Sequence, residues 1–195
     1  MAVIVEERDM GAVFVHGCLG GVAAGLVLGV TAIVSTVALG DSASDPFRFV
    51  AAFVVGDDAF SSDFSLLAAL LLGSTIHFAL SALYGIVFVA LLALTFQLSA
   101  RAWLLVLYGA AFAFSVWEVN FLAAVPLSFP YLAGRLDLGT QLWNGVVSYC
   151  LVYGPALGVY VALVRPGVID SWRGRSAPGG TFTPPTGPTS SRSER

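Results

Sequence analysis

The sequence predicts an all-α fold, a polytopic membrane helical bundle of four transmembrane helices with a long interfacial or re-entrant first loop. Two features of the composition predict this class. Hydrophobic residues make up 57% of the 195-residue chain and charged residues only 11%, whereas a soluble domain carries about 25% charged residues. The charges are also clustered, and four of the uncharged runs between them reach the ~20 apolar residues that cross a ~30 Å hydrocarbon core.

The four predicted spans follow from these apolar runs. They cover about residues 11–39, 74–98, 102–126 and 138–164. Only residues 99–101 separate the second span from the third, so these two helices are expected to be antiparallel neighbours.

The two ends of the chain are expected to lie outside the membrane. Residues 1–10 are acidic and lack the basic stretch of a cleaved signal peptide, so we interpret the first span as retained. Residues 171–195 are rich in Pro, Gly, Ser and Thr, a composition that buries little apolar surface and predicts a disordered tail.

The first loop, residues 40–73, is long and contains two apolar runs too short to span. Asp45-Pro46 is typical of a helix start and precedes the run FRFVAAFVVG. The second run, FSLLAALLLG, ends at Gly73. We expect one or two interfacial or re-entrant helices here. A single helix over 64–98 is the alternative, but it is about 52 Å long at 1.5 Å per residue, which favours a break near Gly73.

The arginines predict the orientation. With four spans both termini share a side, and the arginines of that side include Arg8, Arg101, Arg165, Arg173 and Arg175. The opposite side carries two arginines and six aspartates: Arg48, Arg135, Asp41, Asp45, Asp57, Asp58, Asp63 and Asp137. The positive-inside rule places both termini in the cytoplasm of a cell, with the protein multi-pass in its membrane.

Four glycines recur every four residues in the first span, at Gly17, Gly21, Gly25 and Gly29. Residues four apart share one face of a helix, so the glycines form a smooth groove into which another helix can pack closely. This pattern, a glycine zipper, predicts a helix-packing surface for self-association or for other membrane subunits.

Polar residues at helical spacing occur in the other three spans. The predicted intramembrane polar cluster consists of His77, Ser81, Glu118, Asn120, Asn144 and Ser148. Polar groups in a spanning helix usually face the bundle interior, and by depth His77, Glu118 and Asn144 all fall in the outer half of the membrane. We therefore expect Glu118 to approach His77 or Asn144, either as an ion or proton site or as a hydrogen bond between helices.

A haem held by His16 and His77 is disfavoured, because the two begin different spans at opposite sides of the membrane. Their expected difference in depth is about 20 Å or more at 1.5 Å per residue. No metal site or cofactor is expected within the chain, although a haem or pigment shared with another subunit is not excluded.

Three segments resemble a loosely defined group of small bacterial four-helix membrane proteins. They are FRFVAAFVVG, HFALSALYGIVF and LYGAAFAFSVWEVNFLAAVPLSFPYL. Members often carry a histidine in the fourth helix, where this chain has Trp143-Asn144. The resemblance implies a bacterial inner-membrane fold of four helices and no established activity.

The sequence contains no nucleophile elbow, phosphate-binding loop or spacing of zinc ligands, so we expect that the protein is not an enzyme. No basic patch alternates with aromatic residues, so no nucleic acid is expected as a partner. The leading hypothesis is an accessory subunit that packs against other membrane subunits through its glycine-lined face. The alternative is a small oligomeric transporter or channel-like protein that uses Glu118 and His77, and a weaker one is a cofactor-holding subunit of a redox or light-driven complex.

Overall fold

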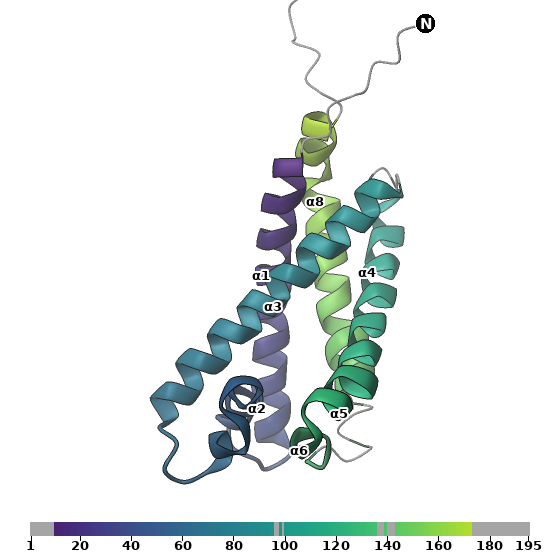
Figure 1. The fold of residues 1–195 in the computed structure, drawn as a ribbon. Helices are drawn as coiled ribbons and strands as arrows, with labels where there is room; N and C mark the ends of the chain where they lie inside the picture. Colours follow the sequence, from purple (N-terminus) through teal and green to yellow (C-terminus); the bar gives the residue numbers. More distant parts are fainter. Residues whose placement is uncertain (1–9, 96–97, 99, 136–138, 140–142, 173–195) are drawn as a thin grey trace, which may run out of the picture.

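The fold is all-helical, in a computed structural model that describes residues 10–95, 98, 100–135, 139 and 143–172, with the backbone alone for 144 and 165–172. Within these ranges, four helical segments are long and apolar enough to cross a membrane. Figure 1 shows that the start of α1 and the end of α8 lie at one end of the bundle, the terminal end, while α2 lies at the other, the α2 end.

The segments long and apolar enough to span a membrane match the predicted number. They are α1 (Met10–Ala38), α3 (Leu66–Leu94), the segment Ala102–Ser128 and the segment Gly145–Val164. The third consists of α4 (Ala102–Trp117), η3 (Glu118–Ala124) and α5 (Val125–Ser128), and the fourth lies within η4 (Trp143–Tyr153) and α8 (Gly154–Trp172). Residues 173–195 of the predicted tail and residues 1–9 lie outside the described residues, whereas Ser171 and Trp172 belong to α8 rather than to the tail.

The predicted break near Gly73 is wrong. α3 runs without interruption from Leu66 to Leu94, 29 residues, or about 43 Å at 1.5 Å per residue, and it crosses the bundle obliquely (Figure 1). Gly73 is instead a point of close approach to α2 (Asp45–Val55). A Cβ atom added to Gly73 would lie 2.9 Å from the Cα of Phe47 and closer still to its carbonyl oxygen.

The glycine-lined face of α1 packs against α3 of the same chain. A Cβ atom added to Gly17 would lie 2.5 Å from the Cα of Ile86, and one added to Gly21 would meet the backbone of Ser81. From the other side, a Cβ on Gly85 would lie 2.6 Å from the Cα of Gly21. Gly17, Gly21 and Gly25 are therefore covered by α3 of the same chain, whereas a Cβ on Gly29 would lie 3.5 Å from His77 Nε2. Docking of another subunit on this face stays a prediction. We call the contact between the two helices the α1–α3 seam.

A second close contact, the α4–α8 seam, joins the other two spans. Gly109 and Gly154 face each other, and a Cβ on Gly154 would lie 2.7 Å from the Cα of Ala110. One turn further, a Cβ on Gly158 would lie 2.6 Å from the Cα of Val106. Small residues of this kind bring helix backbones together where lipid gives no hydrophobic driving force.

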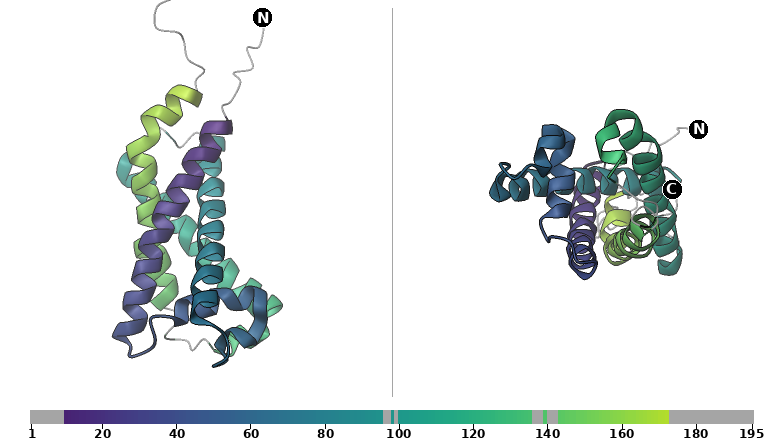
Figure 2. Two further views of the ribbon diagram at one scale, coloured as in Figure 1. Left: turned by 90° about the vertical axis from the view of Figure 1, so that its left-hand side faces the viewer. Right: turned by 90° about the horizontal axis from the view of Figure 1, so that it is seen from below.

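A short loop connects α3 and α4, and the two helices meet near this loop. There the ring centroids of Phe88 and Phe112 lie 5.2 Å apart. Towards the α2 end they diverge, as Figure 2 also shows from the side and from below. The predicted neighbours are therefore in contact over only part of their length.

Two segments in the α2 half of the bundle, η3 and η4, are π-helical, with hydrogen bonds from residue i to residue i+5. Each ends two residues before a proline, because η3 ends at Ala124 before Pro126 and η4 ends at Tyr153 before Pro155. Proline lacks the N–H that an α-helix needs and clashes with the carbonyl of residue i−4. The wider helix upstream accommodates that clash.

The first loop is a small folded unit at the α2 end. It contains α2, η1 (Gly56–Phe60) and a contact with α6 (Pro130–Ala133). Buried Ala51, Ala52, Ala59, Val125 and Leu132 form its core. The Tyr131 hydroxyl donates to the Ala52 carbonyl at 2.7 Å, so α6 holds α2 in place.

Candidate functional site

His77 lies on α3 beside the glycines of α1. Its Nε2 is 2.8 Å from the carbonyl oxygen of Gly25. A carbonyl only accepts hydrogen bonds, so Nε2 donates, and in the neutral ring Nδ1 is left as an acceptor. The predicted contact of His77 with Glu118 is not formed, because the histidine points to α1.

Glu118 lies on the outer surface of the bundle. Its side chain is exposed, and the described residues give it neither a hydrogen bond nor an ion pair. The side chain of Asn144, its other predicted partner, lies outside the described residues. The exposed side chain contradicts the expectation that Glu118 faces the bundle interior, because Glu118 continues the exposed stripe of α4 that contains Leu107, Ala111 and Ser115. A contact with Asn144 stays a prediction.

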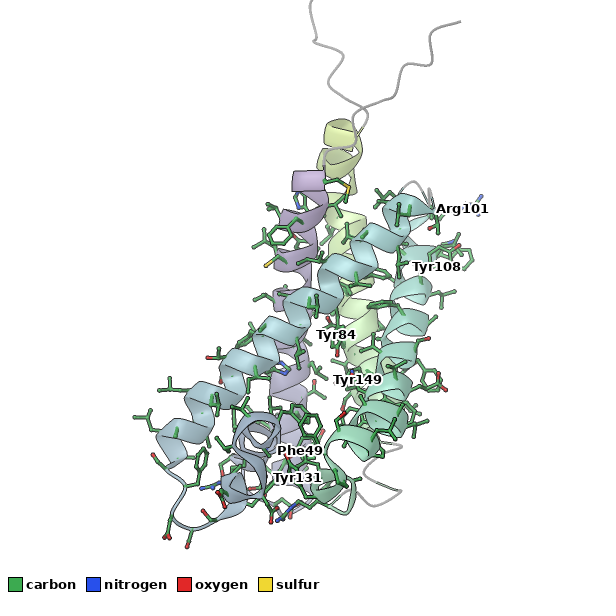
Figure 3. All side chains as sticks on the ribbon, in the orientation of Figure 1. Phe49, Tyr84, Arg101, Tyr108, Tyr131 and Tyr149 are labelled. Atoms are coloured by element: carbon green, nitrogen blue, oxygen red, sulfur yellow. The ribbon has the colours of Figure 1, made fainter. Side chains whose placement is uncertain are left out.

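Asn120 forms the hydrogen-bonded contact between α3 and η3. The hydroxyl of Tyr84 is 3.1 Å from Asn120 Oδ1 and 2.9 Å from Asn120 Nδ2. Tyr84 and Tyr149 both lie in the space where α3 diverges from α4 (Figure 3). The sequence analysis placed Asn120 correctly inside the bundle but did not identify Tyr84 as its partner.

The two serines of the predicted cluster are both buried. Ser81 is 4% exposed and Ser148 is 3% exposed. The backbone carbonyl of Ser81 accepts a hydrogen bond of 3.0 Å from the hydroxyl of Tyr153, a residue that the sequence analysis missed. The Oγ of Ser148 has no hydrogen-bond partner.

The two histidines have separate surroundings. His16 Nδ1 is 3.5 Å from the hydroxyl of Tyr160, at the terminal end of the bundle, whereas His77 contacts Gly25. Among the described residues no three His, Cys, Asp or Glu side chains converge as metal ligands would.

A large cleft opens at the α2 end between α1, α2, α3, η3 and η4. We call it the α2 cleft, and its volume is about 840 Å³. Polar lining residues include Ser74, His77, Ser148 and Tyr149, and the remainder is mostly apolar. On α1 the lining reaches Leu26 and stops before Gly25, where α3 closes on α1.

One wall of the cleft is aromatic. The rings of Phe49 on α2 and Phe121 on η3 are stacked, with centroids 6.4 Å apart and planes at 13°. The ring of Tyr149 on η4 meets Phe121 edge-on at 6.0 Å. Figure 3 labels Phe49 and Tyr149 at the two ends of this wall.

The rim of the cleft carries two aspartates and two arginines, so its formal charges cancel: Asp41, Asp45, Arg48 and Arg135. Arg135 is already engaged with Asp57 at 2.7 Å. Arg48 donates to the carbonyls of Ala59 at 2.7 Å and Phe64 at 3.2 Å, and it thereby holds the loop that follows α2.

Together, the four apolar helices and the close seams between them are compatible with a multi-pass membrane protein. Comparison with known proteins found no matching family model and no significant similarity to a curated protein or a solved structure. The resemblance to small bacterial four-helix proteins thus stays a prediction, and function has to be argued from the Glu118 surface and the α2 cleft.

Proposed function

We propose that the protein is a non-enzymatic integral membrane protein that acts as an accessory subunit. In this proposal it docks on another membrane subunit through one face of α4 and η3 rather than through the glycines of α1. The docking surface, the Glu118 face, consists of exposed residues at helical spacing: Leu107, Ala111, Ser115, Glu118, Val119 and Leu122.

The outward carboxylate of Glu118 is the observation that carries this proposal. Glu118 is the 17th residue of the 27-residue span Ala102–Ser128, so both neighbouring stretches of helix are apolar. A carboxylate at the centre of a lipid-facing helix costs about 2.5–3.5 kcal/mol on insertion scales. Because no described residue of the chain pairs with it, a partner subunit that supplies a cationic or amide side chain would remove this cost.

The shape of the Glu118 face also suits a helix of a partner. Ala111 and Ser115 are small and lie between exposed Leu107 and Leu122, which are 54% and 57% exposed. Small residues permit close helix approach, and a polar group at the contact adds a hydrogen bond. The transporter alternative has less support, because His77 and Glu118 do not share a site.

The proposal predicts that Glu118→Leu separates the protein from its partner while the isolated chain keeps its fold. Tagged protein purified in mild detergent from the membranes of its own cells should retain a partner subunit, and Glu118→Leu should lower partner recovery at least about tenfold. The thermal stability of the isolated variant should be unchanged or raised, since an unpaired carboxylate is lost.

Two leucines give the matched control. Leu122→Ala on the Glu118 face should reduce partner recovery, whereas Leu163→Ala on α8, where the side chain is 75% exposed, should not. Wild-type protein that purifies alone, or equal recovery from Glu118→Leu, would contradict the accessory-subunit proposal.

The proposed orientation places both termini in the cytoplasm and the α2 end outside, on the arginine asymmetry alone. A reporter fused after Arg175 should therefore be active in the cytoplasm, and a tag inserted near Asp57 should be labelled from outside intact cells. Labelling of the Asp57 tag only after the cells are opened would reverse the orientation.

A further inference from the structure

We propose that the α2 cleft binds an uncharged, ring-bearing lipophilic molecule with a hydroxyl group, of the quinol or phenol class. The inference does not depend on the Glu118 face. Size and composition suit a small-molecule site, because the volume is about 840 Å³ and the lining is mostly apolar, with hydroxyl or imidazole groups of Ser35, Thr36, Ser74, His77 and Ser148 among it.

The polar groups inside the cleft select a hydroxyl. Nε2 of His77 is committed as a donor to the carbonyl of Gly25, so the neutral ring offers Nδ1 as an acceptor. A ligand that meets this nitrogen has to donate a hydrogen bond. A hydroxyl does so, whereas a ketone or quinone oxygen does not.

Ser148 is the second observation that points to a ligand. It lines the cleft, it is 3% exposed, and its Oγ has no hydrogen-bond partner. A buried hydroxyl without a partner costs free energy, so such groups usually have a role. The serine side chain turns between three staggered rotamers, and its hydroxyl can donate to or accept from an oxygen of the ligand.

The aromatic wall and the charged rim of the cleft indicate that the ligand has a flat ring and no charge. The rings of Phe49, Phe121 and Tyr149 form a continuous aromatic wall, on which a flat ring stacks or packs edge-on. At the rim, Arg135 is paired with Asp57 and Arg48 donates to backbone carbonyls, while Asp41 and Asp45 add negative charge. The rim therefore offers little to a phosphate headgroup, and this favours an uncharged ligand over a phospholipid.

The test uses a benzoquinol with a decyl chain and the corresponding quinone. Full-length protein in lipid nanodiscs is titrated with each probe under oxygen-free conditions, and binding is followed by tryptophan fluorescence, because Trp143 lines the cleft. Wild type should bind the quinol at least about tenfold more tightly than the quinone. Ser148→Ala should weaken quinol binding about five- to tenfold, which corresponds to one lost hydrogen bond, without lowering the melting temperature.

Ser115→Ala is the matched control, since Ser115 also lies in a span but donates to the Ala111 carbonyl of its own helix at 3.2 Å. Thr75→Ala is a second control outside both proposed surfaces, since exposed Thr75 donates to the Leu71 carbonyl of its own helix at 2.7 Å. Both controls should leave quinol binding unchanged. Equal affinity for quinol and quinone would overturn the proposal, as would unchanged binding in Ser148→Ala. A tightly held phospholipid that the quinol does not displace would overturn it as well.

Discussion

Gly21→Ala is expected to force α1 and α3 apart and to lower the free energy of unfolding by about 1–3 kcal/mol, the usual cost of overpacking. The added Cβ would lie 2.9 Å from the Cα of Ala82 and closer still to the carbonyl oxygen of Ser81. These are backbone atoms, so no side-chain rotation relieves the contact. Gly21→Leu, with a larger side chain, should prevent the folded protein from accumulating in the membrane.

Gly29→Ala is the control on the same helix. Its Cβ would lie 3.5 Å from Nε2 of His77, an ordinary contact, so stability should change by no more than about 0.5 kcal/mol. Thermal unfolding in detergent, with the yield of folded protein, separates the two variants. Similar losses from Gly21→Ala and Gly29→Ala would show that the α1–α3 seam is not as tight as described.

Gly154→Ala is expected to destabilise the other half of the bundle by a similar amount, about 1–3 kcal/mol. The new Cβ would lie 2.6 Å from the carbonyl carbon of Gly109 and 2.7 Å from the Cα of Ala110. Gly134→Ala is the control, because among the described residues the nearest atom to its Cβ would be the carbonyl oxygen of Tyr131, at 4.0 Å.

A double substitution sharpens this second test. Gly109 and Gly154 meet across the α4–α8 seam, so the first alanine already separates the helices and the second should cost less than it does alone. The two losses should therefore be less than additive. Full additivity, or a loss from Gly134→Ala as large as that from Gly154→Ala, would contradict the seam.

Hydropathy predicted the four spans because each apolar run is longer than a membrane-spanning helix requires. The same approach failed at Gly73, since a glycine that ends a helix and one that admits a neighbouring backbone look alike in sequence. A side chain at residue 73 would clash with the backbone of Phe47, which lies 26 positions earlier in the sequence. Local pattern does not report such a contact.

Periodicity likewise identified the glycine face of α1 but not its occupant. The four-residue spacing predicts a surface for close packing, and α3 of the same chain fills it, with Gly85 facing Gly21. The polar cluster was predicted in part. Ser81 and Ser148 are buried as expected for interior positions. Ser115 and Glu118 share one face of the helix as their spacing predicts, but that face is exposed, and spacing alone does not distinguish an interior face from an outer one.

The two π-helical segments contain more residues per turn than an α-helix, so the number of residues in them sets the rotation between the helices on either side. A hydrogen bond from i to i+5 encloses one residue more than the α-helical bond, and one residue corresponds to about 100° of rotation. An evolutionary deletion of a single residue within Glu118–Ala124 would therefore turn the upstream helix by over a quarter circle relative to Pro126. The α4–α8 seam upstream and the contacts of Val125 and Leu132 downstream could then not both be kept. In this part of the protein, the number of residues before each proline is as much a determinant of the surface as their identity.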